Sequence, residues 1–108
     1  MFVSIVALAL SSFQSLPDGY TSKITVRASG GMCVTEFWTT GNSVGYSVNL
    51  PATGVYDALE GMISGNLDAS SGANETPLLE MAQRNAGRIE SACLRSANGG
   101  GGRFPAAS

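Results

Sequence analysis

The chain has 108 residues, which is enough for one folded domain around one core. Hydrophobic residues make up 44% of it and charged residues 13%, which excludes an intrinsically disordered chain, and its 14 glycines predict many turns. Six basic residues against eight acidic ones leave too little positive charge to neutralise a phosphate backbone, so we expect no nucleic-acid partner. The chain has no histidine, which excludes Ser-His-Asp and Cys-His catalysis and removes the commonest metal ligand.

The chain begins with an apolar segment. Phe2–Leu10 is an apolar run, and Ala9 and Ser11 have the spacing of a signal-peptidase site, although no Lys or Arg precedes the run. The run is shorter than the roughly 20 residues that a membrane-spanning helix needs, so no stable membrane span is expected. We interpret residues 1–15 as a signal peptide and expect a periplasmic or secreted protein. A buried strand or helix of a cytosolic protein is the alternative.

Three antiparallel β-strands are predicted next. Lys23–Ser29 alternates apolar and polar residues, and Gly30 and Gly31 suit a two-residue hairpin turn. A second turn at Gly41 and Asn42 adds a third strand with Val44 facing inward. The register predicts these inner-face pairs: Ala28 with Cys33, Val26 with Thr35, Ile24 with Phe37, Phe37 with Tyr46, Thr35 with Val48, and Cys33 with Leu50.

The opposite face of this meander holds a candidate binding surface. Its charged and aromatic members are Lys23, Arg27, Glu36 and Trp38. Glu36 is diagonal to both basic residues, where opposite charges attract. An exposed aromatic side chain among charges is typical of protein interfaces, so we predict that this surface binds a partner. The alternatives are that Trp38 covers Gly45, its expected cross-strand neighbour, or is itself covered by Phe13–Tyr20.

Two helices are predicted after the strands. Gly54–Ser64 has apolar residues at helical spacing, with Thr53 as its N-cap. Thr76 and Pro77 begin a second helix, which ends at Asn98. The predicted fold is therefore α+β: a three-stranded antiparallel meander packed on one face by two C-terminal helices, in the order β-β-β-α-α.

The remaining C-terminal residues are rich in glycine. Residues 99–108 have few apolar side chains to bury, and we expect them to form a flexible tail. A docking peptide around Arg103 and Phe104 is the alternative. Residues 16–98 are then the single α+β domain.

The two cysteines are predicted to form a disulfide. Cys33 falls on the inner face of the second strand, and Cys93 falls on the inner stripe of the second helix. Disulfides persist in oxidising compartments, so this pairing agrees with export. Two unpaired buried thiols are the alternative and would accompany a cytosolic protein.

Few residues offer a site for chemistry. Arg84, Arg88 and Arg95 share the second helix and suit recognition of a carboxylate or phosphate group, with a solvated helix face as the alternative. Asp57 and Glu60 lie one turn apart and are the plausible pair for carboxylate-dependent catalysis or a hard cation. We assign no catalytic residue, metal ligand or cofactor from the sequence.

Together these features predict a small exported, disulfide-stabilised, non-catalytic binding or accessory domain. Its expected partner is another protein of the cell envelope or the extracellular space. Two alternatives stay open: a small carboxylate-dependent hydrolase, and a subunit of a homo-oligomeric or structural assembly in which the outer sheet face or an uncleaved Phe2–Leu10 segment is buried by a neighbouring copy.

Overall fold

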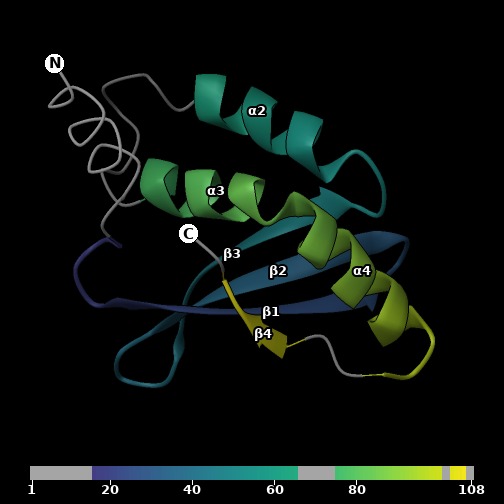
Figure 1. Cartoon of the computed structure of the whole chain (residues 1–108), viewed down its shortest axis with the longest axis horizontal. Helices are drawn as coiled ribbons and strands as arrows, with labels where there is room; N and C mark the ends of the chain where they lie inside the picture. The colour runs from purple at the N-terminus through teal and green to yellow at the C-terminus, as the bar shows by residue number, and fades with distance from the viewer. Residues whose placement is uncertain (1–15, 66–74, 101–102, 107–108) are drawn as a thin grey trace, which may run out of the picture.

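The computed structural model describes residues 16–65, 75–100 and 103–106. Over these residues, an antiparallel sheet of four strands is covered on one face by three helices (Figure 1). The strands are β1 (Tyr20–Ser29), β2 (Met32–Thr39), β3 (Val44–Pro51) and β4 (Arg103–Pro105), arranged in the order β3-β2-β1-β4. The helices are α2 (Val55–Gly65), α3 (Glu75–Arg84) and α4 (Ala86–Ala97). The apolar segment Phe2–Leu10 lies outside the described residues.

The register predicted for the meander is confirmed at its inner face. All six predicted pairs occur: Ala28–Cys33, Val26–Thr35, Ile24–Phe37, Phe37–Tyr46, Thr35–Val48 and Cys33–Leu50. Gly30 and Gly31 join β1 to β2 with φ values of 58° and 82°, a backbone conformation that glycine adopts without steric cost. The apolar side chains of three strands therefore meet on one face of the sheet.

At its far end, the β2–β3 pair departs from the prediction. The register shifts just before Trp38, which lies opposite Val44 and not opposite Gly45. Trp38 therefore does not cover Gly45. A Cβ atom at Gly45 would come within 2.6 Å of both the Tyr20 hydroxyl and Thr39 Cγ2, so these side chains occupy that space. The sequence predicts that Val44 faces inward, but Val44 is 41% exposed. The register irregularity places Val44 opposite Trp38, which lies on the other face of the sheet.

The second predicted helix is divided into α3 and α4 at Asn85. This residue has φ −116° and ψ 23°, which is outside the helical region, and its side chain is buried. Its Nδ2 donates a hydrogen bond of 2.7 Å to the carbonyl of Met81. Asparagine side chains compete with the backbone for such hydrogen bonds, which explains the break at this position.

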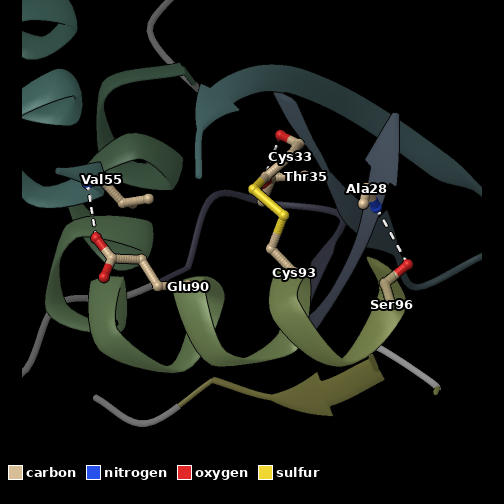
Figure 2. Close-up of a disulfide and its surroundings, with 7 residues drawn as sticks. All are labelled: Ala28, Cys33, Thr35, Val55, Glu90, Cys93 and Ser96. Carbon is tan, nitrogen blue, oxygen red and sulfur yellow. Dashed lines mark hydrogen bonds between the residues drawn. A yellow bond between two sulfur atoms is a disulfide. The ribbon is translucent and has the colours of Figure 1, made fainter. Parts of the chain in front are cut away.

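The start of α2 is tied to α4. Val55 is the first residue of α2, and its N–H donates to the Glu90 carboxylate at 2.9 Å (Figure 2). A carboxylate at a helix N-terminus satisfies a free N–H group and interacts favourably with the helix dipole. The residue directly before the helix is Gly54, whose carbonyl accepts from the Ala58 N–H at 3.0 Å, so the predicted N-cap Thr53 is one residue too early.

The C-terminal tail contains a strand. β4 pairs with β1, placing Phe104 opposite Ile24, and Phe104 is only 7% exposed. The prediction of a flexible tail over residues 99–108 is therefore wrong at Arg103–Pro105. This segment instead lies on the chain's own sheet, because one buried aromatic ring and the free edge of β1 offset the entropy cost of ordering a short segment.

The core lies between the sheet and the helices. Its largest fully buried apolar side chains are Phe37, Ile24, Leu50, Leu59, Leu78, Leu79, Ile89 and Val55. They come from strands β1 to β3 and from all three helices, so each of these elements contributes to one core. None of the helices in the described ranges is long and apolar enough to cross a membrane.

Helix α4 is attached to the sheet at two points. The predicted disulfide is confirmed: Cys33 of β2 and Cys93 of α4 are bonded, with their Cα atoms 5.7 Å apart (Figure 2). One turn further along α4, the Ser96 hydroxyl accepts a hydrogen bond of 3.1 Å from the Ala28 N–H (Figure 2). The β4 pairs stop at Thr25, so Ser96 satisfies an N–H group of β1 that β4 does not reach.

Candidate functional site

The face of the sheet opposite the helices brings the predicted binding residues together. This outer face is formed by Lys23, Thr25, Arg27, Val34, Glu36, Trp38 and Arg103. All four predicted members of the surface are present on it. Arg103 joins them because β4 places it directly opposite Thr25.

Trp38 is held in place by a network across β1 and β2. Its indole Nε1 donates to Thr25 Oγ1 at 2.9 Å, and that hydroxyl donates to Glu36 Oε1 at 3.1 Å. The ammonium group of Lys23 lies 3.9 Å from the centre of the indole ring, which is a cation-π contact. Arg27 extends the network through an ion pair with Glu36 at 3.9 Å. The indole is therefore fixed in one orientation on a surface where it remains partly exposed.

The charge of the outer face opposes the charge of the chain. The described residues of the outer face carry an excess of positive charge, with three basic side chains, Lys23, Arg27 and Arg103, and one acidic side chain, Glu36. The whole chain, in contrast, has a net charge of −2. The Arg27 side chain is 60% exposed, so its pairing with Glu36 is screened by water and leaves its charge available to a partner. This surface is suited to an acidic partner.

A depression lies where α3, α4 and β4 meet. This arginine groove has a volume of about 620 Å³ and contains the three arginines predicted to lie near one another, Arg84, Arg88 and Arg95. Phe104 of β4 lies beside them, with its ring centre 4.9 Å from Arg88 Cζ. Arg84 belongs to α3 and Arg88 and Arg95 belong to α4, so the groove runs across both helices.

A further depression adjoins the disulfide and was not predicted from the sequence. It has a volume of about 700 Å³ and lies between the β1–β2 turn and α4. Leu94 and Met32 line it and are 64% and 38% exposed, and Cys93 also lines it. Leu94 falls outside the apolar stripe of its helix, so helical periodicity did not assign it a role.

The carboxylate pair considered for catalysis has a structural contact. Asp57 and Glu60 are both exposed on α2 and line neither of the two depressions. Glu60 Oε1 accepts a hydrogen bond of 2.7 Å from Gln83 Nε2, which connects α2 to α3. Within the described residues, no group of three or more Asp, Glu, Cys or His side chains is close enough to hold a metal ion.

Two neighbours of the candidate sites lie in a segment that the sequence did not predict to be a strand. Arg103 and Phe104 were assigned to a flexible tail, although the alternative of a docking peptide had singled them out. The available signal was Phe104 itself, a large apolar residue in an otherwise glycine-rich segment. Its pairing partner in β1 is distant in the sequence, so periodicity within the tail did not reveal the strand.

Tyr46 is expected to make the stability of the protein depend on pH in the alkaline range. Burial raises the pKa of its phenol above the ordinary value of 10.0, and Glu75 and Tyr20 raise it further. The neutral phenol is thus favoured by folding, so its contribution to stability is complete below the pKa of the unfolded chain and is lost as pH rises through the higher folded pKa. We expect Tyr46→Phe to reduce the alkaline loss of stability, measured by urea unfolding from about pH 8 to pH 11.

Near neutral pH, where the phenol is uncharged in both states, Tyr46→Phe and the parent protein should unfold at similar urea concentrations. An alkaline loss of stability that is unchanged in Tyr46→Phe would contradict this assignment.

Comparison with protein-family models, with curated proteins and with solved structures finds no match to this chain. The outer face and the arginine groove are therefore the basis on which its function is inferred.

Proposed function

We propose that this protein is a small exported binding module, stabilised by its disulfide, which docks through the outer face on an acidic surface of another protein in the cell envelope or the extracellular space. The observation that carries the proposal is Trp38, an aromatic side chain that is partly exposed and yet fixed by Thr25 and Lys23. The proposed role of the protein is binding, and no catalytic step is assigned to the protein.

A fixed aromatic side chain is favourable for binding. Ordering a side chain on association costs free energy, and an indole that is already oriented avoids much of that cost. Tryptophan and arginine are also enriched among the residues that dominate binding energy at interfaces. Trp38 and Arg27 lie on the same face, so the outer face has the composition of an interaction centre.

The charges of the outer face favour an acidic partner. Among its described residues, the outer face has three basic side chains, Lys23, Arg27 and Arg103, and one acidic side chain, Glu36. This excess of positive charge attracts partners of opposite charge over long distances and raises the rate at which they associate. A protein surface fits better than a nucleic acid, because the remaining basic residues lie on α3 and α4 and do not extend this face into a phosphate-binding track.

Export is the second part of the proposal. A disulfide is a feature of proteins in oxidising compartments, and Cys33–Cys93 supports the placement of the folded domain there. The interpretation of residues 1–15 as a signal peptide agrees with this location. The carboxylate-dependent hydrolase receives less support, because Glu60 is engaged with Gln83.

Site-specific photocross-linking in intact producing cells tests this function. A photoreactive amino acid is introduced at Val34, on the outer face opposite Arg27, or at Tyr56, which is 56% exposed on α2. We expect a partner to cross-link from residue 34 and not from residue 56. Its affinity, measured with purified proteins, should fall roughly tenfold or more in Trp38→Ala, as for a central interface aromatic.

The controls separate binding from folding. Trp38→Phe keeps an aromatic ring and should retain more affinity than Trp38→Ala, and circular dichroism confirms that both variants are folded. Unchanged affinity in a folded Trp38→Ala variant would overturn the docking proposal. A partner that resides in the cytoplasm would overturn the export part.

A further inference from the structure

We propose that the arginine groove is a binding site for a phosphate monoester group, with Arg88 as its central residue. The groove lies on the helical side of the domain, so this inference does not depend on the outer face. It rests on how Arg88 is held, on what lines the groove and on the volume available.

Arg88 is exposed but held in place. Its guanidinium lies against the Phe104 ring, with 4.9 Å between Cζ and the ring centre, and its Nη1 is 3.5 Å from Asn85 Oδ1. Asn85 is 2% exposed and is itself fixed by the hydrogen bond of its Nδ2 to Met81. A buried amide and an aromatic ring thus orient an arginine on the surface, whereas an arginine on an ordinary solvated helix face has no such support.

The surroundings of Arg88 suit an oxyanion. Ser91 lies one turn further along α4 and offers a hydroxyl donor to the same space. Gly87 lines the groove without a side chain, and apart from its chain neighbours and the adjacent backbone of its own helix, no atom lies within 4 Å of the position that a Cβ would take there. Arg84 and Arg95 also line the groove, and its described lining contains no Asp or Glu.

These features favour a phosphate monoester over a carboxylate. A guanidinium fork donates two parallel hydrogen bonds to either group, but a monoester has up to two negative charges near neutral pH and three oxygens that can accept. The Arg88 fork and the Ser91 hydroxyl, in a depression that Arg84 and Arg95 also line, suit the larger charge of a phosphate monoester. A volume of about 620 Å³ is within the range of small-molecule sites, so the groove has room for the organic part of the ester.

Titration with inorganic phosphate, followed by ¹⁵N NMR at constant ionic strength, tests the site. We expect saturable shifts of the Gly87 and Ser91 amides and of the Arg88 side-chain Nε resonance. Arg88→Gln should weaken phosphate binding roughly tenfold or more, and Arg88→Lys should weaken it as well, because lysine keeps the charge but loses the fork. Arg88→Lys also keeps the net charge, which limits effects on folding.

The matched control is Arg27→Gln. It removes the same charge from the outer face and should leave phosphate binding in the groove intact, so a nonspecific effect of net charge is separated from a site. If Arg27→Gln and Arg88→Gln weaken binding equally, or if phosphate causes no saturable shifts in the groove, the proposal is overturned. Phe104→Leu, which retains an apolar side chain but removes the ring beneath Arg88, should reduce phosphate affinity in the folded protein.

Two sources of the phosphate group are distinguished by a second measurement. Glucose 6-phosphate represents a soluble ester, and phosphatidylcholine vesicles containing phosphatidic acid represent a lipid headgroup. If the parent protein binds glucose 6-phosphate and Arg88→Lys does not, the site is assigned to a soluble ester. If the parent protein binds the vesicles and Arg88→Lys does not, the site is assigned to a lipid headgroup. Both results support a phosphate monoester site, and failure of both probes would overturn it.

Discussion

Replacing Cys33 and Cys93 together is expected to lower the free energy of unfolding by about 4 kcal/mol. The disulfide joins residues separated by 60 positions and thereby restricts the unfolded chain between them. A domain of this size has a total stability of roughly 5–15 kcal/mol, so the loss would remove a large fraction of it. Urea unfolding of Cys33→Ala/Cys93→Ala, compared with the parent protein with and without reductant, measures the effect.

The choice of alanine keeps this test specific. Both cysteines are buried, at 0% and 4% exposure, so serine would add the cost of burying a hydroxyl, whereas alanine adds only a small loss of packing. Reduction of the parent protein should produce a similar loss of stability without any change of sequence. If the double variant and the reduced protein unfold at the same urea concentration as the oxidised protein, the cross-link does not stabilise the domain.

The inner face of the meander was predictable because its signals are local. Strict alternation in Lys23–Ser29 sets which residues face inward, and the two-residue turn at Gly30 and Gly31 sets the register with the next strand. Once that register is fixed, Cys33 must face the core. The apolar stripe of the second predicted helix placed Cys93 independently, so the disulfide followed from two local patterns.

The departures from the prediction depend on contacts that local patterns do not contain. Asn85 breaks a helix whose apolar spacing continues on both sides, because its side chain binds the Met81 carbonyl. At the register shift before Trp38, the side chains of Tyr20 and Thr39 fill the space over Gly45 that a Cβ would take. In each case a side chain competes with regular backbone geometry, and the outcome is decided by packing.

The candidate surfaces were likewise predictable where local patterns determine them, and not where contacts between distant residues do. Strand alternation predicted that Lys23, Glu36 and Trp38 share one face, and the structure adds the hydrogen bond to Thr25 that fixes the indole. Helical spacing predicted that Arg84 and Arg88 lie near each other. Their groove is completed by Phe104, whose position depends on pairing between β1 and a strand that is distant in the sequence.

Replacing Phe104 with alanine is expected to lower the free energy of unfolding by about 3 kcal/mol, near the lower end of the range for large core side chains. The ring is 7% exposed and lies opposite Ile24, and it is the buried residue of β4. Without it, the short strand loses the contact that compensates its entropy cost. Urea unfolding measures the loss of stability, and hydrogen exchange of the Lys23–Thr25 amides shows whether β4 has separated from β1.

Pro105→Ala is the matched control, because Pro105 belongs to the same strand and is exposed, so its replacement should leave stability nearly unchanged. A Phe104→Ala variant as stable as the parent protein, with unchanged exchange at Lys23–Thr25, would show that β4 does not contribute to the cooperative fold.

The expected separation of β4 from the sheet has a further consequence, since β4 and Ser96 together cover the edge of β1 that faces away from β2. Freeing that edge exposes unpaired backbone groups that can pair with another chain, so Phe104→Ala should also increase self-association, measured by sedimentation velocity.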